Sequence, residues 1–152
     1  MQKTKIMVTG GAGFIGSELV RQIAARGMSA RVVDNLVNGK RENLVDVLGE
    51  SVELIVADVR DESAISEALR GVDLVFHLAC LGVRHSIHSP LENHEVNASA
   101  TLGLLNLARQ AAVKRFVYVS TSEVYGTIRT APIAEDHPTL PCTVYGLSLI
   151  HI

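Results

Sequence analysis

Seven residues near the start of the chain, Gly10–Gly16 (GGAGFIG), constrain its fold more than any other segment. They follow a strand-like apolar run, Ile6–Thr9, and precede a helix-like run, Ser17–Arg26. A second apolar run, Ala30–Val33, ends at the acidic residue Asp34. This order of strand, glycine turn, helix, strand and acid is the layout of a dinucleotide-binding βαβ unit.

The glycine turn has a physical role in that layout. A residue without Cβ lets the chain turn tightly and lets backbone N–H groups approach a pyrophosphate. The helix that follows presents unpaired N–H donors and a partial positive charge to the phosphates. We therefore expect Gly10, Gly13, Phe14, Ile15 and Gly16 to bind the cofactor.

Asp34 predicts which dinucleotide is bound. Its carboxylate can accept hydrogen bonds from an adenosine ribose and would repel a 2′-phosphate, which favours NAD over NADP. Arg31, Lys40 and Arg41 lie close enough in sequence to weaken that preference.

The composition excludes several other classes of protein. The 152 residues suffice for one domain with a sizeable core, and 47% hydrophobic with 20% charged residues is typical of a soluble globular protein. A net charge of −2 indicates neither a nucleic acid nor a membrane surface as partner. We expect no signal peptide, no membrane span and a cytoplasmic location. The two cysteines form no disulfide framework, and we expect Cys80 to be a small buried residue or a neighbour of the cofactor.

Apolar runs alternate with helical patterns along most of the chain, which predicts an α/β fold. The expected arrangement is a Rossmann-type, doubly wound parallel sheet with strand order 3-2-1-4-5. Beyond the first unit, we predict strands at 52–56, 73–78 and 115–119, helices at 41–48, 61–69 and 91–112, and loops at 79–90 and 121–143.

Each predicted strand is followed by residues that could serve a ligand. In an open α/β sheet the ligand lies beyond the carboxyl ends of the strands. Polar residues end many strands, but five such endings on one rim favour a shared site. After the glycine turn, the endings are Asp34-Asn35 with Asn38 in the following loop, Asp58-Val59, His77-Leu78-Ala79-Cys80, and Ser120-Thr121-Ser122-Glu123. The Asp58 carboxylate could bond an adenine amino group.

These motifs together resemble one known family. The chain is similar to the N-terminal part of an extended short-chain dehydrogenase/reductase of the nucleotide-sugar epimerase/dehydratase type. The matching segments are 9–16 (TGGAGFIG), 34–36 (DNL), 58–59 (DV), 77–79 (HLA), 96–97 (VN), 120–126 (STSEVYG) and 145–146 (YG).

The resemblance implies an activity and its residues. Tyr145 would remove a proton from a sugar hydroxyl, hydride would pass to NAD to give a keto-sugar, and Thr121 would hold the sugar oxygen and relay the proton. Tyr145 would also contact the cofactor, as would Leu78, Ala79 and Cys80, and Asn97 would contact the cofactor loop. The substrate would be a UDP- or dTDP-hexose, and the full-length protein could be a homodimer.

Ser122 and Glu123 occupy positions where dehydratases often carry an acid pair. Because Ser122 stands in place of Asp, the pattern disfavours a hexose 4,6-dehydratase. It stays compatible with a UDP-glucose 4-epimerase, a sugar-acid decarboxylase and some other dehydratases.

Three histidines, His85, His88 and His94, cluster in sequence without a nearby set of ligands that would complete a metal site. We therefore predict no metal. Arg84 and His85 are expected to face the substrate instead.

The family pattern breaks after Tyr145. The family motif Tyr-x-x-x-Lys would place a lysine at position 149, where this chain has Leu149. Residues 147–152 (LSLIHI) are also the translation of CTG TCT CTT ATA CAC ATC, the start of a transposon-end adapter used in sequencing libraries. We therefore expect a truncated NAD-binding domain at 1–146 and a non-native tail at 147–152. Such a chain, without a substrate domain, is expected to bind NAD weakly at best and not to turn over a sugar. A non-catalytic NAD-binding module is the alternative from another class.

Overall fold

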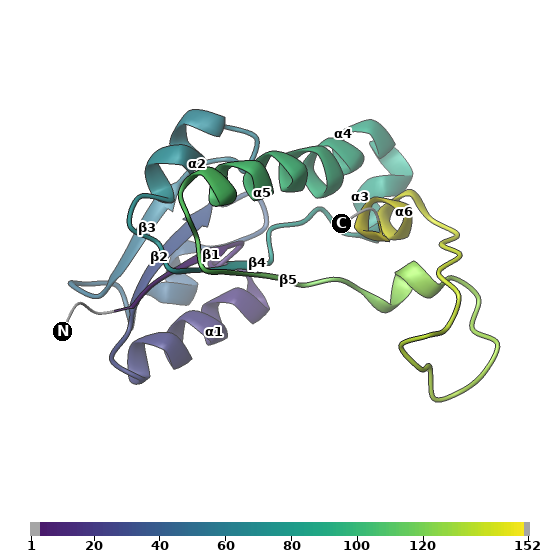
Figure 1. Ribbon diagram of the computed structural model, residues 1–152, viewed down its shortest axis with the longest axis horizontal. Helices are drawn as coiled ribbons and strands as arrows, with labels where there is room; N and C mark the ends of the chain where they lie inside the picture. Colours follow the sequence, from purple (N-terminus) through teal and green to yellow (C-terminus); the bar gives the residue numbers. More distant parts are fainter. Residues whose placement is uncertain (1–3, 151–152) are drawn as a thin grey trace. The chain divides into compact units, whose positions relative to one another are not determined.

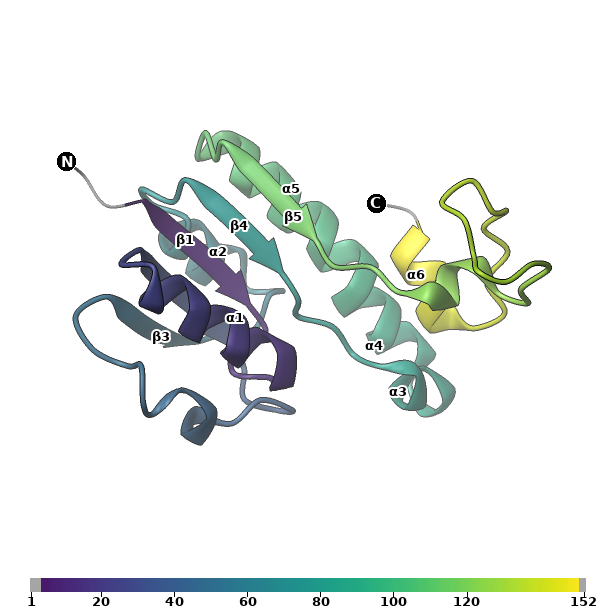
Figure 2. The same cartoon turned by 90° about the horizontal axis from the view of Figure 1, so that it is seen from below.

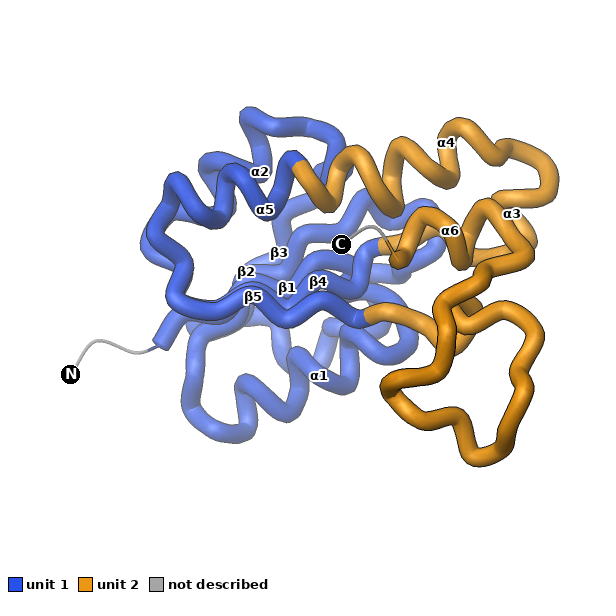
Figure 3. Tube along the Cα trace, turned by 45° about the vertical axis from the view of Figure 1, so that its right-hand side comes forward, with its two compact units in different colours: residues 1–79, 103–119 blue, residues 80–102, 120–152 orange. Residues whose placement is uncertain are grey.

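A computed structural model describes residues 4–150 of the chain. The chain forms two compact units, which Figure 3 distinguishes by colour. Unit 1 comprises residues 1–79 and 103–119, and unit 2 comprises residues 80–102 and 120–152.

Unit 1 contains the predicted parallel sheet. Its strands are β1 (Lys5–Thr9), β2 (Ser29–Asp34), β3 (Val52–Val56), β4 (Leu74–His77) and β5 (Arg115–Tyr118). Their order is β3-β2-β1-β4-β5 with every pairing parallel, which confirms the prediction; Figure 2 shows β1, β4 and β5 side by side. The register aligns Thr9 with both Val33 and His77, so the carboxyl ends of three strands meet at one rim.

Both faces of this sheet are buried under helices. Helix α1 (Phe14–Ala25) covers one face, where Val20 and Ile23 pack with Ile6 and Val8 of β1. Helix α2 (Glu62–Ala68) and residues of α5 (Ala100–Gln110) cover the other, as Figure 1 shows. Successive residues of a strand point to opposite faces, so Met7 joins this second core.

The helix boundaries differ locally from the sequence expectation. Helix α1 starts at Phe14 rather than Ser17, because Gly13 is extended and the helical backbone begins directly after it. Helix α2 has Asp61 as its N-cap, whose carboxylate accepts the Ala64 N–H at 3.0 Å. The predicted helix 41–48 is reduced to a 3-10 helix, η1 (Arg41–Leu44).

Unit 2 contains short helical segments. These are α3 (Val83–His88), α4 (Pro90–His94), the π-helix η2 (Glu95–Ser99), the 3-10 helix η3 (Ser122–Tyr125) and α6 (Val144–Ile150). The predicted loop 79–90 is wrong where α3 forms, and the predicted helix 91–112 is a run of α4, η2 and α5. Within residues 4–150, no helix is long and apolar enough to cross a membrane.

Candidate functional site

The glycine turn in unit 1 holds the end of β1 directly against the segment after β4. Gly10 has φ +68°, and a Cβ there would lie 2.7 Å from the backbone nitrogen of Ala79. A Cβ on Gly16 would collide with the Gly10 carbonyl. Both positions therefore exclude a side chain, as a close backbone turn before a helix requires.

Helix α1 begins at this turn with an open N-terminus. Its N-cap, Gly13, offers no side-chain hydrogen bond, and no acidic residue lies in the first turn. The first-turn N–H groups therefore have no side-chain acceptor, and the positive end of the helix dipole has no carboxylate beside it in that turn. A cleft of about 660 Å³ lies along the first two turns of α1, and its charged lining comprises Lys40, Arg21 and Glu18. These features fit a dinucleotide pyrophosphate.

Asp34 is tied to the same turn. Its carboxylate is 8% exposed and accepts the Ala12 N–H at 3.0 Å and the Leu36 N–H at 2.9 Å. A carboxylate has about four lone-pair directions, so the remaining ones suit a ribose diol. Arg31 donates to the carbonyls of Ala68 and Arg70, at the end of α2, at 2.6 and 3.1 Å and forms an ion pair with Glu53 of β3, so its charge already has partners other than Asp34.

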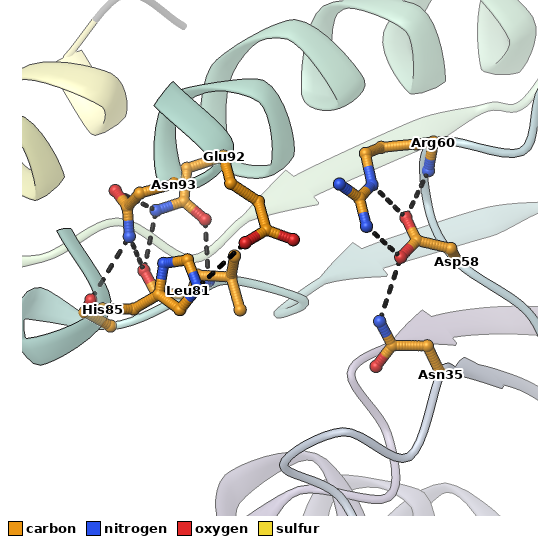
Figure 4. A network of polar contacts seen from close by, with 9 residues as sticks. Asn35, Asp58, Arg60, Leu81, His85, Glu92 and Asn93 are labelled. Carbon is orange, nitrogen blue, oxygen red and sulfur yellow. Dashed lines mark hydrogen bonds and ion pairs between the residues drawn. The ribbon is translucent and has the colours of Figure 1, made fainter. Parts of the chain in front are cut away.

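Asp58 carries a different set of partners, shown in Figure 4. Oδ1 accepts the backbone N–H and Nε–H of Arg60, both at 2.9 Å. Oδ2 accepts Arg60 Nη2 at 2.8 Å and Asn35 Nδ2 at 3.0 Å. The Arg60 guanidinium holds the pKa of Asp58 well below its usual range. Because its acceptor directions are occupied, the predicted bond to an adenine amino group would have to displace one of these donors. Val59, which follows, is half-buried.

His77 fixes the end of β4. Its Nδ1 lies 2.5 Å from Thr9 Oγ1, which also accepts the Ala79 N–H at 3.3 Å, while the Leu78 N–H donates to the Thr9 carbonyl at 3.1 Å. The predicted cofactor residues Leu78 and Ala79 are thus held by their backbones. His77 is 1% exposed and stacks on Tyr118, and burial lowers its pKa to about 4.

In unit 2, two buried amides hold the segment that begins at Cys80. Asn97 Oδ1 accepts the Leu81 N–H and Asn97 Nδ2 donates to the Leu81 carbonyl, both at 2.8 Å. Asn93 Nδ2 donates to the same carbonyl at 2.8 Å, a contact visible in Figure 4. Asn97 is 1% exposed, so its contact is with the loop backbone rather than with solvent. The π-helix η2 contains Asn97, and such segments are frequent at functional sites.

Sequence reasoning missed Asn93. Its detectable signal is a pair of polar amides four residues apart, Asn93 and Asn97, which lie on one helix face.

Tyr145 on α6 has two polar neighbours. Its hydroxyl interacts with the side chains of Thr121 and Cys80, so the predicted base and hydroxyl lie together. Burial raises the pKa of Tyr145, and the Cys80 thiol and Glu123 raise it further, while the bond with Thr121 opposes this. Cys80 is exposed, which excludes the buried alternative.

The other members of the predicted catalytic set lie in η3. Ser122 and Glu123 are both exposed, and Thr121 Oγ1 accepts the Glu123 N–H at 3.3 Å. Leu149, at the position of the family lysine, is buried on α6 with 5% exposure.

Two of the clustered histidines, His85 and His94, have separate partners. His85 Nε2 pairs with Glu92 at 3.2 Å, as Figure 4 shows, and His94 Nδ1 lies 2.9 Å from Ser148 Oγ. Among residues 4–150, no group of three or more His, Cys, Asp or Glu side chains could hold a metal ion.

Comparison with known proteins gives a consistent set of relatives. Residues 7–150 match the family model described as GDP-mannose 4,6 dehydratase. The UDP-glucose 4-epimerase of Bos taurus is 36% identical over 97% of this chain, and UDP-glucuronic acid decarboxylase 1 of Arabidopsis thaliana is 40% identical over 90% of it. The structure of DesIV, a dTDP-glucose 4,6-dehydratase from Streptomyces venezuelae solved with NAD bound, matches with a TM-score of 0.91 and 37% identity over 96% of this chain.

The chain spans only part of these relatives. It covers 46% of the Bos taurus epimerase, 30% of the Arabidopsis thaliana decarboxylase and 48% of the DesIV chain.

Proposed function

The chain belongs to the NAD-dependent epimerase/dehydratase family, and on that premise we propose that it is the cofactor-binding part of a nucleotide-sugar epimerase similar to UDP-glucose 4-epimerase. One observation carries the cofactor assignment. The glycine turn opens an uncapped helix, and the same turn is hydrogen-bonded through Ala12 to the Asp34 carboxylate. The phosphate-binding and ribose-binding groups of a dinucleotide site are thereby held as one piece.

The residues of unit 1 have separate tasks in this site. Gly10, Gly13 and Gly16 with the backbones of Phe14 and Ile15 would receive the pyrophosphate. Asp34 and Asn35, with Asn38 from the loop, would bind the adenosine ribose and its phosphate. Bound NAD would accept a hydride from a sugar carbon.

The residues of unit 2 would handle the proton. Tyr145 would accept it from the sugar hydroxyl, and Thr121 would orient that hydroxyl. A phenol whose pKa is raised by burial is a poor base at neutral pH, and the cation that would correct this is missing because position 149 is Leu. The chain by itself is therefore expected to bind the cofactor without turning over a sugar.

Dinucleotide titration of the purified chain tests the cofactor assignment. We expect calorimetric binding of NAD, and about tenfold weaker NAD binding by Asp34→Asn, which keeps the side-chain volume but loses the charge. Asp136→Ala, which removes an exposed carboxylate elsewhere in the chain, is the matched control and should leave the affinity unchanged. A wild-type chain that binds no dinucleotide, or an Asp34→Asn variant that binds NAD equally well, would contradict the assignment.

Two observations support other functions, one catalytic and one non-catalytic. Ser122-Glu123 and the decarboxylase relative favour a sugar-acid decarboxylase or a dehydratase. Leu149 favours a non-catalytic NAD-binding module. Product analysis of the full-length protein with UDP-glucose, UDP-glucuronate and dTDP-glucose separates the three reactions. A full-length protein that has Leu rather than Lys at position 149 and converts none of the three would favour the module.

A further inference from the structure

Gly39 lies directly on the Asp34 carboxylate. It is buried, and a Cβ on it would stand 2.7 Å from Asp34 Oδ1, 2.8 Å from Oδ2 and 2.9 Å from Cγ. A methyl group cannot occupy that space unless the carboxylate or the loop moves. The carboxylate is short and is held by two backbone N–H donors, so the loop has to give way.

The same loop is fastened to the glycine turn at Ala12. The Ala12 N–H donates to Asp34 Oδ2, while the Ala12 carbonyl accepts the Lys40 N–H at 3.0 Å and Asn43 Nδ2 at 2.8 Å. Ala12 is fully buried between these partners. A displacement of the loop at residue 39 therefore acts on the bond made by its neighbour Lys40.

We propose that Gly39 is a positioning residue that sets the selectivity of this site for NAD over NADP. The absence of a side chain lets residues 35–43 close over Asp34 and keep its carboxylate in one orientation beside the glycine turn. The inference rests on the proposed function, because it concerns the same ribose-binding carboxylate.

Charges of opposite sign at this site act on the choice between NAD and NADP. In the closed loop the negative charge of Asp34 stays in place and opposes a 2′-phosphate. Lys40 and Arg41 are exposed cations within residues 35–43. A loop pushed outward by a methyl group draws the Leu36 N–H away from Asp34 Oδ1 and so loosens the carboxylate, while both cations stay available to a 2′-phosphate. The ratio of NAD affinity to NADP affinity then falls.

The decisive variant is Gly39→Ala, compared with Gly49→Ala. Gly49 has open space where its Cβ would be, and its φ lies outside the left-handed region, so it provides a matched control for the added methyl group. We expect Gly39→Ala to weaken NAD binding at least about tenfold while NADP binding changes less than about threefold. Gly49→Ala should keep both affinities within about twofold of the wild type.

The ratio of the two affinities is the readout, since general damage to the fold lowers both together. Circular dichroism checks that each variant folds. If Gly39→Ala does not fold, Asn43→Ala replaces it, because that variant removes one donor to Ala12 without adding a methyl group near Asp34. Asn43→Ala is expected to lower the ratio of NAD affinity to NADP affinity at least about threefold.

The outcomes are distinguishable. A wild-type chain that binds no NAD rejects the proposed function and this inference with it. A wild-type chain that prefers NAD, with variants that keep the same preference, rejects the inference alone.

Discussion

The buried imidazole of His77 predicts a specific dependence of stability on pH. Burial lowers the pKa of His77 from 6.5 to about 4, so the folded chain binds a proton at this site less readily than the unfolded chain does. The unfolded state then holds more protons between those two values, and the free energy of unfolding falls as the pH falls through that window. Above about pH 7 the imidazole is neutral in both states and contributes no slope.

The expected size follows from the same two values. A pKa that moves from 6.5 to about 4 corresponds to about 3 kcal/mol once both states have titrated. Between about pH 7 and about pH 4.5, the loss should be about 2 kcal/mol. Acid loss at Asp58 occurs lower: it begins near the ordinary aspartate pKa of 3.8 and continues below it, because Arg60 lowers the pKa of that carboxyl in the folded chain. The two effects therefore occupy different parts of the pH scale.

The assay is urea unfolding, followed by circular dichroism, of the wild type and of His77→Gln over that range. The glutamine keeps a hydrogen-bond acceptor for Thr9 but does not titrate, so the variant should lose the His77 part of the slope. His88→Gln removes an exposed imidazole and should keep it. If the difference in unfolding free energy between wild type and His77→Gln is constant from about pH 7 to about pH 4.5, the reasoning is refuted.

Two further predictions concern unit 2. Asn97→Ala leaves the buried Leu81 N–H without its acceptor and should lower the free energy of unfolding by about 3 kcal/mol in urea titrations. Asn106→Ala, on the exposed side of α5, should change that free energy little, and equal losses in the two variants would contradict the prediction. Leu149→Lys places a cation one helical turn after Tyr145 and should lower the pKa of that phenol, measured by absorbance titration against a Tyr145→Phe reference. Leu147→Lys should leave the pKa unchanged. An unchanged titration midpoint in Leu149→Lys would contradict the electrostatic role assigned to position 149.

The comparison of sequence with structure separates local from distant effects. The strands were predicted from short apolar runs, which local sequence contains in full, and the sheet order from the handedness of the crossovers between them. The helix α3 was missed because residues 83–88 (VRHSIH) show little apolar periodicity, and the segment forms a helix in the context of unit 2. The π-helix η2 inside a predicted continuous helix shows no pattern that spacing alone would reveal.

For the candidate site residues too, the sequence predicted positions, whereas distant contacts determined the partners. The place of Asp58 after a strand predicts a ligand contact, but its lone pairs are taken by Arg60 and by Asn35, which lies 23 residues away. Asn97 was chosen by resemblance, and the structure shows which backbone groups it holds. The roles predicted for Asp34, Thr121 and Tyr145 stay predictions until binding and turnover are measured.

The amino-acid sequence alone determined the βαβ unit and the strand order, because periodicity acts between near neighbours and right-handed crossovers restrict the order of parallel strands. Tertiary structure alone decided which carboxylates keep free lone pairs, that Gly39 covers Asp34, and that the Tyr145 phenol has a raised pKa. Those properties depend on burial and on partners brought together by folding.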